Sequence, residues 1–236
     1  MYDMRGIEWW TSGHFPGSLW YLYEATGADF FQERARGWTE TLKPISKYKG
    51  NHDIGFMMYC SFGNARRLLN TEKYDHLLVE AANTLCLRFN QKLGLIRSWG
   101  SAYDKRDFLV IPDNMMNLEL LEWAAKSKTG EKRFADVARS HADVTMKNHF
   151  RVDGGTYHVL NYSQKDGRVQ GILRGQGAST FTAWSRGQSW AIYGYTMMFR
   201  ESRNKAYRDF AEKVADFAIN HPNMPEDMVP YWDFDA

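Results

Sequence analysis

Apolar residues recur at helical spacing along most of the chain. Residues 18–25, 118–126 and 188–199 each place apolar side chains three or four positions apart, and β-branched runs are few. This pattern predicts a mostly helical, all-α protein. Two polar stretches that contain glycine, 150–177 and 222–235, are typical of long loops or short hairpin strands, and loops of such length usually carry function.

One helix face occurs more than once in the sequence: an aromatic residue followed by alanines at four-residue steps. It is found as Phe134, Ala138 and Ala142 and, 73 positions later, as Tyr207, Ala211 and Ala215. Shifts of 60 and 103 positions bring two further segments, which contain Tyr74 and Trp20, into the same register. We interpret these four units as helical hairpins, each with an apolar first helix, a turn and an amphipathic second helix.

The apolar character of the first helices bears on how the hairpins assemble. A helix that is apolar nearly all round needs neighbours on several sides. This favours a closed double ring of inner and outer helices, an α/α toroid, over an open superhelix. Four hairpins alone can also stop at an arc, and the sequence does not decide between the two arrangements.

Composition and charge exclude several classes of protein. A chain of 236 residues with 44% hydrophobic and 25% charged residues is long enough for one large core, which excludes disorder and small disulfide scaffolds. Its 30 basic and 28 acidic residues leave a formal charge of +2, and no basic run is long enough to follow a phosphate backbone. No apolar run reaches the length of a membrane span, and residues 1–10 lack the pattern of a secretory signal. We therefore expect a soluble protein with no nucleic-acid, membrane or obligate protein partner.

The chain is rich in aromatic residues, with nine tryptophans, 13 tyrosines and 14 phenylalanines. Such residues serve the core first, yet flat aromatic faces also suit sugar rings. The two cysteines, Cys60 and Cys86, lie in apolar surroundings without the spacing of a metal site, so we interpret them as buried thiols.

The shifts that align the helices also align four residues at the start of the first helix of each unit: Trp10, Asp53, Asp113 and Arg186. A ring places these helix starts around one mouth, so an aromatic ring, two carboxylates and a guanidinium would face a common cavity. A structural explanation exists for either aspartate alone, because Asp is common at helix N-caps, where its side chain accepts a backbone N–H.

Asp53 and Asp113 are each followed by bulky apolar residues, which predicts that their carboxyls are partly desolvated. Burial and a like-charged neighbour raise the pKa of a carboxyl, whereas the positive end of a helix dipole lowers it. If the raising effects win, one carboxyl holds a proton at neutral pH and acts as a general acid. The other then stays ionised and anchors hydroxyl groups.

Further candidates lie in glycine-containing segments that let polar side chains reach inward. They are His158, Gln176, Arg186 and Trp190. Trp99 is a candidate stacking wall, although core packing is the commoner role of a single tryptophan. We interpret the other histidines as structural: His14, His52, His76, His141, His149 and His221.

Five ordered blocks of sequence match a known family. They are WTSGHFPG at 10–17, HDIGF at 52–56, PDNMMN at 112–117, RGQSW at 186–190 and PYWDFD at 230–235. Through these blocks the chain resembles the unsaturated glucuronyl hydrolase family of glycoside hydrolases (family 88), from about Trp10 to the end. The resemblance implies an (α/α)6 toroid. Residues 1–236 are then expected to form a single catalytic domain that covers about four hairpins and is truncated at the C-terminus.

The resemblance also implies a reaction. The substrate is an oligosaccharide of the glycosaminoglycan type that a lyase has left with a terminal 4,5-unsaturated glucuronic acid. The family removes this sugar by hydrating its vinyl ether rather than by attacking the anomeric carbon, so the carboxylate-distance rule of other glycosidases does not apply. No metal and no organic cofactor is implied. The family acts in the bacterial cytoplasm or periplasm, and the sequence does not choose between these compartments.

The resemblance assigns roles to individual residues. Asp113 matches the general acid and base, and Asp53 matches the companion carboxylate. Trp10 and Trp99 match aromatic walls of the cavity. The positions that match contacts to the unsaturated ring and its carboxylate are His158, Gln176, Arg186 and Trp190.

Two alternatives stay open. A sister family removes unsaturated galacturonyl residues from pectin fragments (rhamnogalacturonan) with the same toroid and chemistry, although the HDIGF block favours the glucuronyl branch. The chain could instead be a non-catalytic sugar-binding toroid or an inactive fragment. Sulfation preference cannot be derived from the sequence.

Overall fold

A computed structural model describes residues 5–128 and 130–236. The first four residues of the predicted 1–236 domain, and of the 1–10 segment, lie outside the described residues, as does residue 129. The described chain is mainly helical, as predicted. The helices are α1 (His14–Thr26), α2 (Asp29–Thr41), α3 (Ile54–Met58), α4 (Asn64–Leu69), α5 (Asp75–Cys86), α6 (Asn114–Lys126), α7 (Arg133–Asn148), α8 (Ser185–Ser202) and α9 (Lys205–Ile219). A 3-10 turn, Lys43–Lys47, precedes α3, and a π-helical turn, Tyr59–Gly63, joins α3 to α4.

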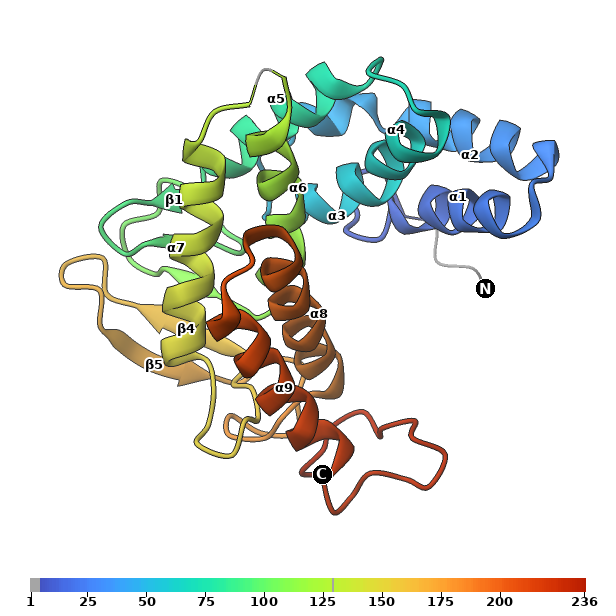
Figure 1. Cartoon of the computed structure of the whole chain (residues 1–236). Coiled ribbons are helices and arrows are strands. Elements are labelled where there is room, and N and C mark those ends of the chain that lie inside the picture. Colours follow the sequence, from blue (N-terminus) through green and yellow to red (C-terminus); the bar gives the residue numbers. More distant parts are fainter. Residues whose placement is uncertain (1–4, 129) are drawn as a thin grey trace.

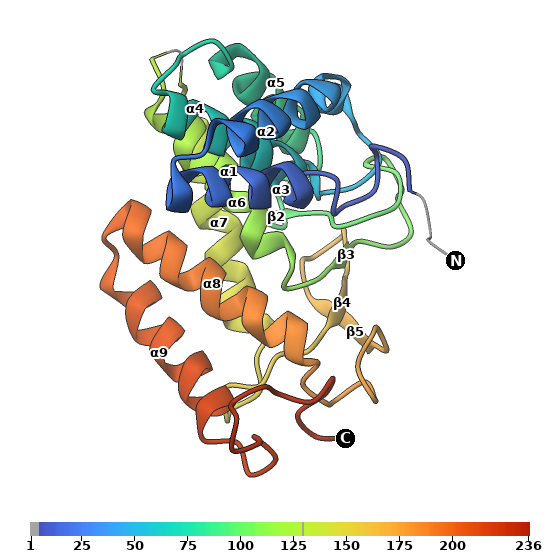
Figure 2. The ribbon, with the colours of Figure 1, turned by 90° about the vertical axis from the view of Figure 1, so that its right-hand side faces the viewer.

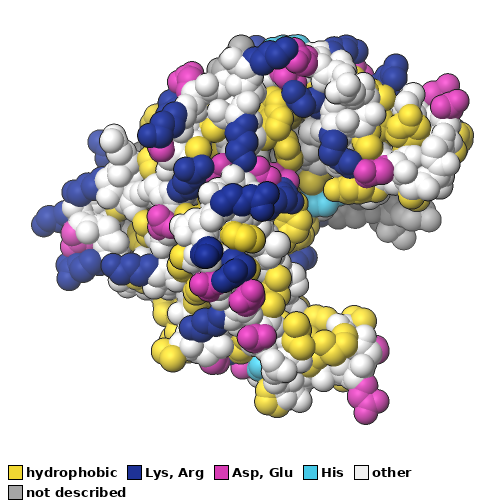
Figure 3. All heavy atoms as spheres, in the orientation of Figure 1, with side chains coloured by type: hydrophobic (Ala, Val, Ile, Leu, Met, Phe, Trp, Pro, Cys, Tyr) yellow, Lys and Arg dark blue, Asp and Glu magenta, His cyan; other side chains and the backbone are white. Residues whose placement is uncertain are grey.

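Helices that are neighbours in sequence pack in pairs. Helix α1 packs on α2, α6 on α7 and α8 on α9, while α5 packs on α3 and the π turn. The first members also contact one another in order, from α1 through the α3–α4 segment and α6 to α8. The pairs follow an arc with α1 and α2 at one end and α8 and α9 at the other (Figure 1). The surface between the two ends is hollowed (Figure 3).

The main core contains the repeated face. Phe134, Ala138, Ala142, Tyr207 and Ala211 all belong to it. Because aromatic rings fill volume while alanine permits close approach, this stripe holds each second helix against its neighbours. Both cysteines are free and half-buried.

Two glycines allow the first helices to approach α6 closely. A side chain at Gly55 of α3 would lie 2.5 Å from Asn117 Oδ1, and one at Gly194 of α8 would lie 2.4 Å from Met115 Cβ. Such distances exclude a Cβ atom, so glycine at these positions brings α3 and α8 against the first turn of α6. The first turn of α6 thereby lies against α3 and against the middle of α8.

A small sheet lies beside the helices. β3 (Leu109–Val110), β4 (Val159–Tyr162) and β5 (Val169–Leu173) form an antiparallel sheet in the order β3-β4-β5, and β1 (Phe89–Asn90) pairs with β2 (Leu95–Ile96). Figure 2 shows the three-stranded sheet to one side of α8 and α9. The 150–177 stretch thus contains the predicted hairpin strands. The 222–235 stretch has no strand. Its end is held by a bridge between Trp184 and Asp233 and by further hydrogen bonds, such as that from the Phe234 N–H to the Ala183 carbonyl.

Candidate functional site

A cavity of about 430 Å³ lies at the starts of the first helices. Six of the eight site residues predicted from the sequence line it: Trp10, Asp53, Trp99, Asp113, Gln176 and Arg186. The other lining residues are Glu8, Trp9, Asn51, His52 and Ile111. Residues from six separate stretches of the sequence therefore meet at one concave surface.

The helix starts deliver the polar groups to this cavity. Asp53 is the residue before α3, Asp113 is the residue before α6, and Arg186 is the second residue of α8. Trp10 lies in the turn that precedes α1. This is the placement that the shared register of the units predicts.

Neither aspartate caps its helix. The side chains of Asp53 and Asp113 make no capping hydrogen bond, although both occupy the N-cap position. Asp113 is only 8% exposed, and its Oδ2 atom has no hydrogen-bond partner. A buried acceptor left unpaired costs about 1–3 kcal/mol, so a purely structural role does not explain this carboxyl.

Burial changes the protonation of both carboxyls. It raises the pKa of Asp113 to about 6, an effect that the nearby His52 ring opposes and the Asp53 charge reinforces. It raises the pKa of Asp53 to about 7, against the opposing effects of the Arg88 guanidinium and the Asn117 amide. From the sequence we expect one protonated and one ionised carboxyl, with the proton on Asp113. Burial in the structure instead raises the pKa of both carboxyls.

The pKa of Asp53 predicts a pH-dependent stability. Its folded value of about 7 exceeds the ordinary value of 3.8, so the native state loses stability as pH rises from about 4 through 7. Asp53→Asn removes this penalty and should raise the free energy of unfolding at pH 8 by up to about 4 kcal/mol. Thermal melts at pH 8 and pH 4 test this, because the gain should vanish at the lower pH. An equal gain at both pH values would contradict a buried, titrating Asp53.

Arg186 is held in place by its neighbours. Its Nη2 atom donates to Gln176 Oε1 at 2.8 Å, and its guanidinium lies 5.2 Å from the Trp10 ring and 4.4 Å from the Trp184 ring. Stacked aromatic faces fix the plane of the guanidinium and leave donors of its fork for an anion. The cavity therefore holds a fixed cation together with Asp53 and Asp113.

His158 lies behind the lining and points toward Asp113. Its Nδ1 accepts from the Gln176 backbone N–H at 2.8 Å, and its ring stacks on Trp184 at 4.3 Å. Burial, reinforced by Arg186, lowers the pKa of His158 to about 4, so the ring is neutral and its proton is on Nε2. That atom is 4.0 Å from Asp113 Oδ2, and neither atom has another partner.

We expected Trp190 to contact the bound sugar, but it lies behind the lining of the cavity. It is one turn beyond Arg186 on α8, and it packs against Phe56 with ring centroids 5.3 Å apart. Phe56 in turn contacts Trp10. Trp190 is not among the residues that line the cavity, so the structure places it as a support of the aromatic wall.

Sequence analysis missed His52, which lines the cavity and which we had interpreted as structural. Its Nε2 lies 3.2 Å from Asp53 Oδ1. The sequence feature that could have identified His52 as a site residue is its position directly before Asp53 in the HDIGF block. Trp9, Glu8, Asn51 and Ile111 carried no comparable signal.

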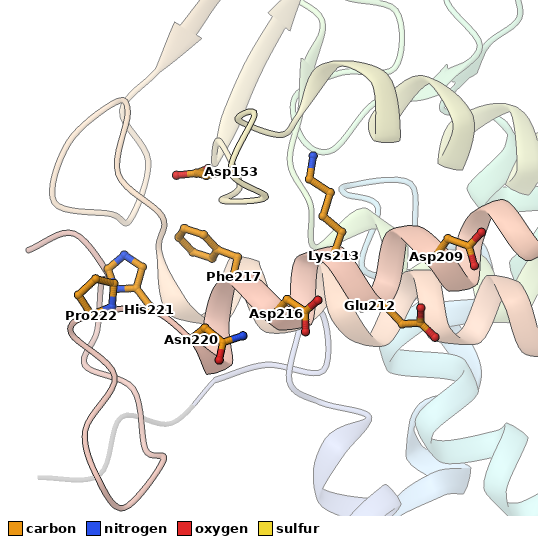
Figure 4. Close-up of a pocket in the computed structure, with 9 residues that line it drawn as sticks. All are labelled: Asp153, Asp209, Glu212, Lys213, Asp216, Phe217, Asn220, His221 and Pro222. Carbon is orange, nitrogen blue, oxygen red and sulfur yellow. The ribbon is translucent and has the colours of Figure 1, made fainter.

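A second cavity, of about 590 Å³, lies between α9 and the loop that contains Asp153 (Figure 4). Asp209, Glu212 and Asp216 are spread along α9 and Asp153 lies in the loop, so these carboxylates do not converge on one point (Figure 4). Across residues 5–128 and 130–236, no group of three or more His, Cys, Asp or Glu side chains could hold a metal ion. In the same part of the chain, no helix has both the length and the apolar character to cross a membrane.

Comparison with known proteins places the chain among the unsaturated glucuronyl hydrolases. No family model matches it. It is 42% identical over 226 residues to the unsaturated glucuronyl hydrolase of Formosa agariphila, which covers 95% of this chain and 56% of that protein. The unsaturated chondroitin disaccharide hydrolase of Streptococcus pneumoniae is 30% identical over 237 residues, which is 99% of this chain and 59% of that protein. The crystal structure of an unsaturated glucuronyl hydrolase specific for heparin matches with a TM-score of 0.94 and 44% identity, over 98% of this chain and 62% of that one.

The chain belongs to the unsaturated glucuronyl hydrolase family. It spans a little more than half the length of the curated relatives it matches. The family is one of glycoside hydrolases with a helical toroid, and the paired helices of this chain fit that fold. Within the family, the cavity with Asp53 and Asp113 is the candidate active site.

Proposed function

We propose that this chain carries the active site of a hydrolase that releases terminal 4,5-unsaturated glucuronic acid from lyase-generated oligosaccharides of the glycosaminoglycan type. One observation carries the proposal: Asp53 and Asp113, both desolvated, share a cavity with Arg186 in a chain of this family. The relatives support the substrate class, since one is named for unsaturated chondroitin disaccharides and one structure for heparin.

The proposal includes the architecture. The four helix pairs are taken as four hairpins of an (α/α)6 toroid, within a single catalytic domain that contains residues 1–236. In this arrangement α1, the α3–α4 segment, α6 and α8 belong to the inner ring, since they contact one another in sequence order. The cavity then opens at the mouth where the inner helices begin.

The proposed reaction is the hydration of a vinyl ether. Asp113 in its acid form donates its proton to C4 of the unsaturated ring, and positive charge develops at C5 and the ring oxygen. The Asp113 carboxylate then takes a proton from water as the water oxygen bonds to C5. The resulting hemiketal opens, and C1 releases the next sugar. The step consumes one water, and Asp113 regains its proton.

The other residues bind the unsaturated sugar in this proposal. Arg186 pairs with its carboxylate, for which the stacked guanidinium is suited. Trp10 and Trp99 stack against the sugar. Asp53 and Gln176 hold ring hydroxyls. His158 faces Asp113 from behind the lining, and Trp190 supports the wall through Phe56. No metal or organic cofactor takes part.

An absorbance assay tests the proposed substrate. Hydration destroys the conjugated double bond, so its absorbance falls as the substrate turns over. We expect turnover of unsaturated chondroitin disaccharide and little or none of the unsaturated pectin disaccharide. Turnover of the pectin product alone would assign the sister activity. Binding without turnover, with both aspartates present, would support a non-catalytic sugar-binding toroid.

A further inference from the structure

Trp9 lines the cavity, yet the proposed reaction gives it no role. The residue is 43% exposed, and the Arg5 guanidinium lies 4.6 Å from the centroid of its ring. A guanidinium stacked on an indole keeps the ring in one plane, and the exposed part of the ring is the part that Arg5 leaves uncovered. Trp9 therefore presents an open aromatic surface at the cavity.

The turn before α1 fixes the position of this surface. The Trp9 carbonyl accepts from the Ser12 N–H at 2.9 Å. At the end of the turn, a Cβ atom on Gly13 would lie 2.3 Å from the Met57 carbonyl oxygen, so only glycine allows this approach to α3. Helix α3 is the helix that Asp53 precedes. The turn thus holds Trp9 in a defined place relative to the reacting groups.

The cavity has a deep end and a mouth. Asp113 is 8% exposed, whereas Trp9 is 43% and Trp99 38% exposed, and all three residues line the same cavity. The carboxyl proposed to react therefore lies deep, while the two indoles lie where the cavity meets solvent.

The identity of the ligand at the mouth rests on the proposed function. In that reaction C4 of the terminal unsaturated ring must reach Asp113, so this ring occupies the deep end of the cavity. The rest of the oligosaccharide is bonded to C1 and must extend toward solvent through the mouth. The second sugar then passes the exposed indole of Trp9, and flat aromatic rings pack well against the apolar face of a sugar ring.

We propose that Trp9 is the stacking residue for the second sugar, the one that the reaction releases from C1 of the unsaturated ring. Trp9 contacts this leaving sugar and not the carbons that react, so it stabilises the bound substrate and the transition state equally. Its loss therefore raises KM and leaves kcat unchanged. Loss of Asp113, by contrast, lowers kcat.

Trp9→Ala, assayed with two substrates, tests the proposal. One substrate is unsaturated chondroitin disaccharide, and the other is the methyl glycoside of 4,5-unsaturated glucuronic acid, which has no second sugar. KM for the disaccharide should rise roughly 10-fold, while KM for the methyl glycoside should stay the same. An equal rise for both would show that the replacement disturbs the cavity itself. That result, or no change for either substrate, overturns the proposal.

Trp38→Ala is the matched control for Trp9→Ala. Trp38 is an exposed tryptophan of α2 that does not line the cavity. Its replacement should change KM for neither substrate.

Calorimetric binding to Asp113→Asn separates this proposal from the proposed function, because it needs no turnover. Adding Trp9→Ala to this variant should weaken binding of the disaccharide roughly 10-fold and leave binding of the methyl glycoside unchanged. If the unsubstituted chain does not turn over the disaccharide and the variants still show this pattern, hydrolysis is refuted and the role of Trp9 stands. Turnover without an effect of Trp9 overturns the role of Trp9 alone. Absence of binding by either sugar also overturns it.

Discussion

Asp113→Asn should lower kcat for unsaturated chondroitin disaccharide by roughly 10³-fold or more, because an amide can neither donate a proton to C4 nor take one from water. The carboxyl is buried, its pKa is raised to about 6, and its Oδ2 atom is unpartnered, so no neighbour replaces it. The absorbance assay measures the loss of rate. Circular dichroism should show an unchanged fold, since Asn fills the same volume.

Asp136→Asn is the matched control for this variant. Asp136 is exposed in the first turn of α7 and lies outside the cavity, so its replacement should leave kcat unchanged. Activity near the unsubstituted level in Asp113→Asn would remove this residue from its role. If Asp53→Asn alone were inactive, the general acid would be Asp53.

Asp53→Asn should lower kcat/KM by roughly 10²-fold and change the pH profile. An amide does not anchor ring hydroxyls as a carboxylate does, and it carries no charge that acts on Asp113. The Asp53 charge contributes to the raised pKa of Asp113, so that pKa should fall in the variant. Activity requires protonated Asp113, and the alkaline limb of the profile therefore moves to lower pH.

The measurement is kcat/KM for the disaccharide between pH 4 and pH 9 in both proteins. The two carboxyls titrate as a coupled pair. The apparent pKa values of the pH profile therefore describe the pair, and replacing one carboxyl leaves the pKa of the other. An alkaline limb that stays in place, or moves to higher pH, would show that the carboxyls do not interact. A small loss of rate with a moved limb would leave Asp53 as a modulator of Asp113 only.

Helical periodicity was enough to predict the long helices and their internal repeat. The 18–25, 118–126 and 188–199 segments lie within α1, α6 and α8. The repeat also predicted that helix starts deliver Asp53 and Asp113 to one cavity, because equal register in each unit fixes where its first helix begins. The short elements could not be predicted this way. A two-residue strand such as Leu109–Val110 is too short to show an alternation of apolar and polar residues. It also pairs with residues some 50 positions away.

The protonation states of the site residues could not be predicted from the sequence either, because they depend on contacts between distant elements. Burial raises the pKa of both Asp53 and Asp113, and groups on other elements, such as Arg88 beside Asp53, oppose this effect. His52 lies buried in the cavity because its backbone N–H donates to the carbonyl of Ser98, a residue more than 40 positions away. Trp190 shares a motif with Arg186, yet helix geometry turns it into the wall behind the cavity. Such features depend on contacts between elements, and local patterns do not encode them.

The distance from C4 of the unsaturated ring to the side chain of residue 113, in a crystal of Asp113→Asn with unsaturated chondroitin disaccharide, tests the central claim most directly. The account predicts that C4 lies about 3–3.5 Å from that side chain, as a near-attack geometry requires, with the uronate carboxylate at Arg186. A sugar bound elsewhere, or with its double bond turned away from residue 113, would contradict it.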